Sequence, residues 1–119
     1  MREFILYGIP NCDTVKKART WLAEHGHDFT FHDFKKQGLD RETAARWLEV
    51  LDWETLINRK GTTWRNLSDE RKAAVNDKSS ALELMLEHTS VIKRPVLEGD
   101  GALAAGFSAD AYARLTGAA

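Results

Sequence analysis

The fold and the candidate site both depend on one stretch, Phe4-Ile5-Leu6-Tyr7-Gly8-Ile9-Pro10-Asn11-Cys12-Asp13-Thr14-Val15-Lys16-Lys17-Ala18. It opens with an apolar run of strand-forming residues that stops at Gly8. After a turn at 10–11, a helical pattern begins at Cys12, the only cysteine in the sequence. The stretch therefore predicts a buried strand over 3–8, a helix after the turn, and Cys12 at the junction between them.

This junction is a favourable place for a reactive thiol. The unpaired N–H groups and the positive dipole end of a helix favour an anion, so Cys12 is expected to ionise more readily than a free cysteine. Lys16, one helical turn on, adds a positive charge, whereas Asp13 opposes it. The alternative is a small buried apolar residue, because free cysteine is among the most buried residue types. Turn residues and a helix start are poor neighbours for a core side chain, which favours the reactive interpretation.

Composition indicates one ordinary domain and excludes several classes of function. The chain has 119 residues, of which 43% are hydrophobic and 29% charged. A formal net charge of -1 gives no global field to attract nucleic acid. No apolar stretch approaches the roughly 20 residues that span a membrane, and the N-terminus does not resemble a signal peptide. We therefore expect no direct nucleic-acid or membrane partner and a cytoplasmic location, where a single thiol stays reduced.

Outward from the opening stretch, the sequence predicts a βαβ unit. The helix continues to about residue 25 and ends at Gly26, as helices commonly do. Alternating residues over 28–34, including Phe29 and Phe31, then indicate a second strand. A crossover between these strands is expected to be right-handed.

The middle of the chain, 36–89, is predicted to be almost entirely helical. Asp40 caps a first helix. A short helix follows at 54–57, and Ser68 begins another that runs to about residue 75. Ser79 or Ser80 opens the last helix of the segment, which reaches residue 88.

Strand character returns near the end of the sequence. Residues 94–97 and 102–104 form two strands around a hairpin turn signal at 98–101. Ser108 caps a final helix.

This order of elements matches the thioredoxin fold. The expected class is α/β, with a four-stranded mixed sheet and an all-helical insertion between the βαβ and ββα halves. The halves are 1–35 and 90–119, the insertion is 36–89, and no linker divides 1–119 into more than a single domain. The resemblance implies a cis proline beside the cysteine, at Pro95, whereas the sequence alone favours the commoner trans form.

Three features of the sequence form a more specific pattern: the run from Tyr7 to Arg19, the pair Asn58-Arg59, and the run Lys93-Arg94-Pro95-Val96. Together they resemble the arsenate reductase (ArsC) family of the glutaredoxin-linked type, in particular its YffB and Spx-like branch, over essentially the whole chain. In these reductases a cysteine attacks an oxyanion that arginines hold, and glutathione with glutaredoxin completes the cycle. The resemblance makes Cys12 the nucleophile and Arg59 and Arg94 the anion-binding arginines.

The remaining candidate site residues lie within this pattern. They are predicted to bind the substrate or glutathione, and they are Asn11, Thr14, Lys16 and Pro95. A guanidinium suits an oxyanion or a glutathione carboxylate because it binds two oxygens at once. Without the resemblance, Arg59 and Arg94 would be interpreted as exposed surface arginines.

Two departures weaken an assignment to arsenate. The His-Asn pair that precedes the proline in arsenate reductases is Gly8-Ile9 here, and their third arginine falls near Gly106-Phe107. Val15 stands where a dithiol motif has its second cysteine, so an external thiol must resolve any adduct. The spacing of Cys12 and Arg19 does not fit a phosphatase-type loop.

The sequence therefore predicts a glutathione-dependent monothiol reductase. Cys12 would attack a disulfide, a sulfenate or an oxyanion, with glutathione as co-substrate, glutaredoxin as a candidate partner and no tightly bound cofactor. The alternative is an Spx-like regulator that contacts the RNA polymerase α subunit, and a further alternative is an arsenate reductase. An inert Cys12 in a degenerate fold also remains open. No metal site is expected, because no histidine has ligand spacing with Cys12.

Overall fold

The structure is a computed structural model that describes residues 4–99 and 101–117. The chain forms two compact units. The sheet unit consists of Met1–Gln37 and Arg94–Ala119, and the helical unit is the intervening Gly38–Lys93. The helical unit thus begins two residues later and ends four residues later than the limits of 36–89 that the sequence suggested for the insertion.

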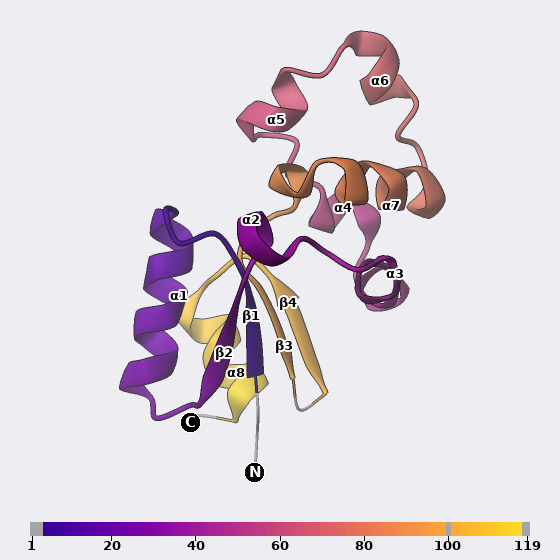
Figure 1. The fold of residues 1–119 in the computed structure, drawn as a ribbon. Coiled ribbons are helices and arrows are strands. Elements are labelled where there is room, and N and C mark those ends of the chain that lie inside the picture. The colour runs from indigo at the N-terminus through magenta and orange to yellow at the C-terminus, as the bar shows by residue number, and fades with distance from the viewer. Residues whose placement is uncertain (1–3, 100, 118–119) are drawn as a thin grey trace. The chain divides into compact units, whose positions relative to one another are not determined.

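The sheet unit is built on the four-stranded mixed sheet that the sequence predicts (Figure 1). Its strands are β1 (Phe4–Gly8), β2 (Phe29–Asp33), β3 (Val96–Gly99) and β4 (Ala102–Ala105). They lie in the order β2-β1-β3-β4. β1 pairs in parallel with β2 and antiparallel with β3, and β3 pairs antiparallel with β4. This arrangement confirms the α/β, thioredoxin-like class.

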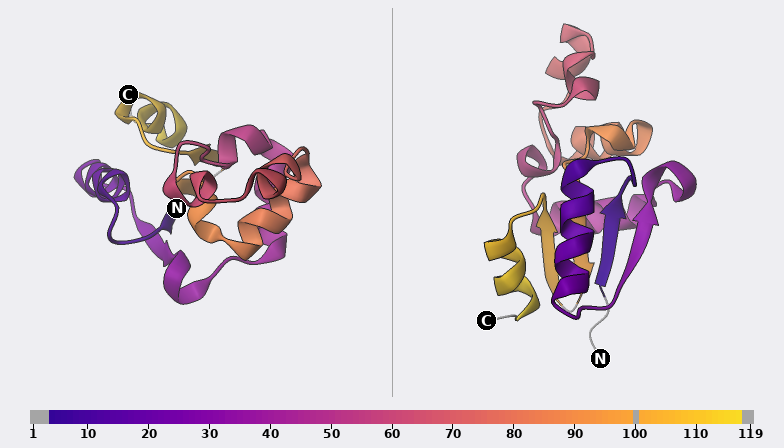
Figure 2. Two further views of the ribbon diagram at one scale, coloured as in Figure 1. Left: turned by 90° about the horizontal axis from the view of Figure 1, so that it is seen from above. Right: turned by 90° about the vertical axis from the view of Figure 1, so that its left-hand side faces the viewer.

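Two helices cover one face of this sheet. They are α1 (Asp13–Glu24) and α8 (Ala109–Thr116), which lie on the same side of the strands (Figure 2). Between them and the sheet is a cluster of buried side chains: Phe4, Leu6, Ala18, Trp21, Leu22, Leu97 and Tyr112. Burial of this apolar surface is the main force that holds the helices on the sheet. It also raises the pKa of the Tyr112 hydroxyl.

α1 approaches β1 closely because Gly8 has no side chain. A Cβ atom at Gly8 would lie 2.8 Å from Cγ2 of Val15, which is fully buried in the first turn of α1. The C-terminal end of α1 is the predicted one, with Gly26 in the left-handed region at a φ of 71°. Ser108 caps α8 as predicted, since its Oγ accepts the N–H of Ala111 at 3.1 Å.

The helical unit contains five α-helices and one 3-10 helix among the described residues. They are α3 (Arg41–Val50), α4 (Trp53–Leu56), α5 (Thr62–Arg65), α6 (Asp69–Ala73), α7 (Lys78–Glu87) and η1 (Thr89–Val91). α3 packs against α7. Arg41 and Glu83 join these two helices by an ion pair of 2.6 Å, and their hydrogen bond raises the pKa of Arg41 and lowers that of Glu83.

Several predicted boundaries are corrected by the structure. β2 ends at Asp33, and Phe34 begins the short helix α2 (Phe34–Gln37) instead of continuing the strand. The cap of α7 is Asp77, whereas Ser80 is the third helical residue and completes a reciprocal capping box with it. α5 was not predicted at all.

The hairpin and its entry also differ in detail from the prediction. Glu98 and Gly99 belong to β3, and the rest of the predicted turn includes residue 100, which lies outside the described part of the chain. The Arg94–Pro95 peptide bond is cis, as the resemblance implies, so the trans form favoured by sequence alone is wrong. No helix within 4–99 or 101–117 is long and apolar enough to span a membrane.

Candidate functional site

The sheet register brings the predicted site segments to one edge. Tyr7 of β1 pairs with Val96 of β3, so the carboxyl end of β1 and the amino end of β3 meet at the same edge. The chain leaves β1 there to reach Cys12 and enters β3 there through Arg94 and Pro95. Figure 1 shows this edge where α1 begins and α2 follows β2. Cys12, Arg94 and Pro95 are therefore brought together within the sheet unit.

Cys12 occupies the N-cap position of α1, as the strand-to-helix junction predicts. Its backbone is extended, with φ of -149° and ψ of 120°, and its side chain is half-buried and free of any disulfide. The first helical hydrogen bond runs from the N–H of Lys16 to the C=O of Cys12, at 2.9 Å. The N–H groups of residues 13–15 precede that bond and have no acceptor in the helix. The thiol accepts no capping hydrogen bond, so these donors face the start of α1 without a helical partner.

The other predicted residues around Cys12 are accessible. Asn11, Thr14 and Lys16 are all exposed, and no ion-pair partner of Lys16 lies within the described ranges. Asp13 is exposed as well, so water screens its negative charge. Lys16 is exposed in the same way, so water screens its charge too, and the helix end is the positive contribution that the fold itself fixes at the start of α1.

Arg94 and Pro95 form the other side of this edge. The Arg94 side chain is half-buried, and in the part of the chain that the structure describes its guanidinium has no ion-pair partner. Pro95 is buried, and its C=O accepts the N–H of Gly106 at 2.8 Å. A charged group that is partly shielded from water and unpaired favours binding of an anion.

The position of the missing third arginine is also at this edge, because Gly106 bonds to Pro95. The next residue, Phe107, packs edge-on against Tyr112 with ring centroids 4.8 Å apart. Arg19 does not replace the missing cation, since its guanidinium lies over the ring of Phe31, 4.4 Å from the centroid. Phe107 thus packs against Tyr112 at the place where the resemblance implies a third arginine.

Arg59 belongs to the helical unit, where it already has a carboxylate partner. Its Nη2 atom lies 2.9 Å from Oε2 of Glu54, and its guanidinium carbon is 5.9 Å from the centroid of the Trp53 ring. Lys60 and Lys93 line the same groove of about 370 Å³ as Arg59 and Glu54. Cations outnumber acids in this groove, so it favours an anionic ligand.

The histidines show no metal site. Two of them, His25 and His88, are exposed, while His27 and His32 are half-buried. Within the described ranges, no three residues among His, Cys, Asp and Glu are placed to bind one metal ion.

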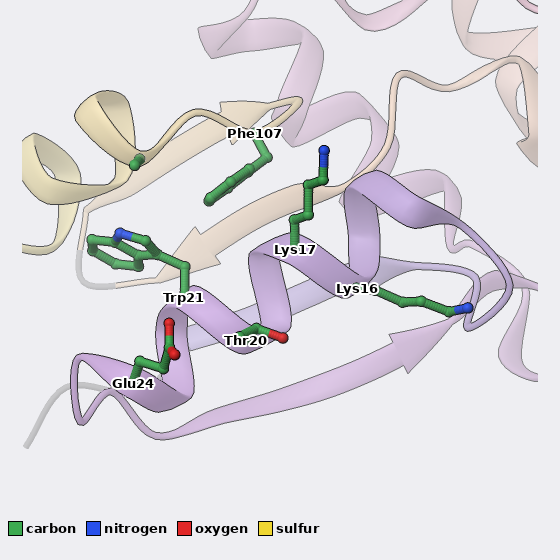
Figure 3. A pocket seen from close by; sticks show the side chains of 7 residues that line it. Lys16, Lys17, Thr20, Trp21, Glu24 and Phe107 are labelled. Carbon is green, nitrogen blue, oxygen red and sulfur yellow. The ribbon is translucent and has the colours of Figure 1, made fainter.

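A second groove, of about 390 Å³, was not predicted from the sequence (Figure 3). It lies between α1 and the segment that leads into α8, and its lining residues are Lys16, Lys17, Thr20, Trp21, Glu24, Phe107 and Ala109. The helical spacing of Lys17, Trp21 and Glu24 could have indicated one wall. Nothing local in the sequence could have indicated that Phe107 forms the other.

The chain is similar to known proteins over nearly its whole length. Residues 7–115 match the model of the ArsC family. An uncharacterized protein of Haemophilus influenzae is 41% identical over 107 residues, which cover 90% of this chain and 93% of that protein. The global transcriptional regulator Spx of Lactiplantibacillus plantarum is 25% identical over 92% of this chain and 83% of its own. The solved structure of the YFFB protein is 52% identical, with a TM-score of 0.89 over 94% of this chain and 97% of the other.

Proposed function

Because the chain belongs to the ArsC family, we propose that it is a cytoplasmic glutathione-dependent monothiol reductase with Cys12 as its nucleophile. The observation that carries the proposal is the free thiol at the N-cap of α1, in a chain that holds no second cysteine. A thiol in this position has helix N–H groups beside it, which stabilise a thiolate. Without a second cysteine, the resolving thiol comes from outside the chain.

The reaction follows thiol–disulfide exchange. The Cys12 thiolate attacks the glutathione sulfur of a mixed disulfide between glutathione and a substrate thiol. A bond forms between Cys12 and glutathione, the substrate disulfide bond breaks, and the substrate leaves as a thiolate that takes up a proton. A second glutathione thiolate then attacks the adduct, which releases oxidised glutathione and restores the Cys12 thiolate. The cycle exchanges one disulfide for another: the mixed disulfide and one glutathione are consumed, and the substrate thiol and oxidised glutathione are formed. Glutaredoxin is the candidate partner in place of the second glutathione.

The other site residues bind and orient in this scheme. The N–H groups of residues 13–15 and the hydroxyl of Thr14 stabilise the thiolate, and Pro95 shapes the wall opposite. Arg94 binds a carboxylate of glutathione with paired hydrogen bonds, and Asn11 and Lys16 contact the same tripeptide from the start of α1. Arg59 remains a predicted anion-binding residue of the groove within the helical unit.

An arsenate reductase is the weaker alternative for the same site. The tetrahedral oxyanion gains most from several converging cations. Phe107 follows the Gly106–Pro95 contact at the place where the family has its third arginine, so one cation is missing.

A regulator that binds RNA polymerase is the alternative from another class. The match to Spx over 83% of that regulator favours it. In that case the chain would bind the polymerase α subunit and need not turn over a substrate. Co-purification with the α subunit would support the regulator, and its absence together with thiol turnover would support the enzyme.

The first test compares the wild-type chain with Cys12→Ser. The substrate is the mixed disulfide of glutathione and 2-mercaptoethanol, with excess glutathione, and the formation of oxidised glutathione is measured. We expect the variant to lose all turnover above the uncatalysed rate, because a serine hydroxyl does not attack sulfur at neutral pH. An unchanged circular dichroism spectrum is the control for folding. Turnover that survives in Cys12→Ser would remove Cys12 from the mechanism.

A further inference from the structure

The groove between α1 and the segment before α8 begins one helical turn beyond Cys12. Lys16 lines its near end and bonds through its N–H to the C=O of Cys12. Glu24 lies at its far end, in the last turn of α1. At about 1.5 Å per residue, the groove follows the helix for on the order of 12 Å. It therefore runs along α1, away from the end of the helix that carries Cys12.

The floor of the groove is aromatic and held in place by its neighbours. Trp21 is only 8% exposed, and His25 stacks on it with ring centroids 3.9 Å apart. Tyr112 packs edge-on against both Trp21 and Phe107, at 5.8 Å and 4.8 Å. Preorganised aromatic surface of this kind binds a large apolar side chain at little cost in entropy.

The charges around the floor are unevenly distributed. Lys16 and Lys17 stand at the end near the thiol, and neither ammonium group has an ion-pair partner in the described ranges. Figure 3 shows Lys17 rising beside Phe107, whereas Lys16 points away along the helix. The single carboxylate of the lining, Glu24, is at the other end. The groove therefore complements a negative charge near the thiol, followed by an apolar group over Trp21.

We propose that this groove receives a segment of a protein substrate, in which an acidic residue and then a large apolar residue follow the reacting cysteine. The inference rests on the proposed function and names its substrate class as a glutathionylated protein. A polypeptide fits better than a small molecule because the channel is long and open along its length. Trp21 is about 13 Å along the helix from Cys12. An extended chain covers that distance in about four residues, at roughly 3.3 Å each.

The covalent step is the one already described, with this substrate. The sulfur of glutathione passes from the substrate cysteine to Cys12, and the substrate cysteine leaves as a thiol. The groove takes no part in bond making; it raises the rate by holding the disulfide next to the thiolate.

The test uses two peptides, each as a mixed disulfide with glutathione. One has the sequence Cys-Ser-Ser-Glu-Phe and the other Cys-Ser-Ser-Lys-Ser. The wild-type chain is expected to prefer the first by about tenfold in kcat/KM, since a buried Phe side chain contributes that much or more. Lys17→Glu is expected to reduce kcat/KM for the first peptide about fivefold, the size of an exposed charge interaction. Lys36→Glu, the same charge change on the exposed surface of α2, is the matched control and leaves the preference intact.

The outcomes separate this inference from the proposed function. Turnover of the 2-mercaptoethanol disulfide that is equal in wild type and Lys17→Glu, with a peptide preference that is reduced in Lys17→Glu and unchanged in Lys36→Glu, supports both. Equal kcat/KM for the two peptides in the wild-type chain, or a preference as large in Lys17→Glu as in wild type, overturns the inference while the proposed function stands.

If the small disulfide is not turned over, the proposed function fails and binding decides the inference. The probe is then the first peptide with Ser in place of Cys, labelled with a fluorophore and added to the Cys12→Ser chain. Binding that weakens when Lys17→Glu is added supports the groove as a peptide site, and equal binding overturns it. Binding of the N-acetyl Glu-Phe dipeptide as tightly as the full peptide would also overturn it, because the groove would then take a small ligand.

Discussion

Cys12 is held in place by its backbone rather than by contacts of its side chain. Its extended φ and ψ make it the last residue before α1, and its C=O closes the first helical turn. The sulfur is left without a capping hydrogen bond. A side chain free of internal partners can react without first breaking an interaction, so the position suits a nucleophile.

Arg94 is the residue whose removal should affect glutathione most directly. In Arg94→Ala we expect kcat/KM for glutathione to fall roughly ten- to a hundredfold, the value of one charge-assisted hydrogen-bonded contact. Arg94→Lys should recover part of the loss, because an ammonium keeps the charge but not the paired geometry. Initial rates against glutathione concentration measure both.

The control for that experiment is Arg65→Ala. Arg65 is an exposed arginine of α5, and no partner of its guanidinium lies within the described ranges. Its removal changes the net charge by the same amount. If Arg94→Ala and Arg65→Ala have equal rates with glutathione, Arg94 does not bind it.

Features of the site that depend on residues close together in the sequence could be predicted, and those that depend on residues far apart in the sequence could not. The position of Cys12 could be predicted because strand, turn and helix signals all lie within a few residues of it. The unpaired state of Arg94 could not, since it depends on which carboxylates the fold brings near. The groove was missed for the same reason: Phe107 reaches Trp21 only through the packing of α8 on α1.

At the scale of elements, the distance between β1 and α1 fixes where the helix start lies. Gly8 allows the close approach, because any Cβ there would meet Val15. The start of α1 carries Cys12, so this contact positions the thiol at the sheet edge without touching it.

Gly8→Ala is therefore expected to destabilise the chain and displace the start of α1. Overpacking of this kind costs about 1–3 kcal/mol. The double variant Gly8→Ala/Val15→Ala removes the clash and should recover a large part of Cys12 alkylation by iodoacetamide at neutral pH. Urea unfolding and the alkylation rate are the measurements. A single variant as stable and as reactive as wild type would show that the approach of α1 does not depend on Gly8.

The helices that the sequence predicted best have clear signals at their ends. α1 lies between a turn and Gly26. α6 follows its cap Ser68, whose Oγ accepts the N–H of Arg71 at 3.0 Å. α5 was missed because its single turn, Thr62–Arg65, lacks an apolar repeat and buries no residue. The sequence assigned the cap of α7 to a serine because serine is a common cap. The cap is Asp77, and the side chain of Ser80, the third helical residue, accepts the backbone N–H of Asp77 in return.

At the scale of the whole molecule, both units bury apolar side chains, and the helical unit carries charged contacts as well. The sheet unit is held by the apolar cluster under α1 and α8. The helical unit adds charged contacts at α7, where the backbone N–H and the side chain of Ser80 lower the pKa of Asp77, and the hydrogen bond to Arg41 lowers that of Glu83.

The helical unit is therefore expected to lose stability in acid. A carboxyl group with a lowered folded pKa stabilises the fold above its unfolded value, about 3.9 for Asp and 4.3 for Glu. That stabilisation is lost as the pH falls through the lower folded value. Amide exchange in α7, corrected for its intrinsic pH dependence, should thus be faster at pH 3 than at pH 6.

Variants of the capping box test this expectation. Asp77→Ala should raise exchange in α7 at pH 6 and make it less dependent on pH. Ser79→Ala, at an exposed neighbouring position, is the control and should keep the wild-type profile. A pH profile that is the same in Asp77→Ala and wild type would show that this carboxylate does not contribute to the acid sensitivity.

The strand order β2-β1-β3-β4 determines where the chain can accept insertions and deletions. β2 and β3 flank β1, so the two points where the helical unit leaves and rejoins the sheet lie two strand spacings apart, about 10 Å. A bridge of a few residues spans that gap. The segment between β2 and β3 can therefore be shortened, lengthened or replaced without a change in strand order. The part of the sheet unit that carries Cys12 is not altered by such a change.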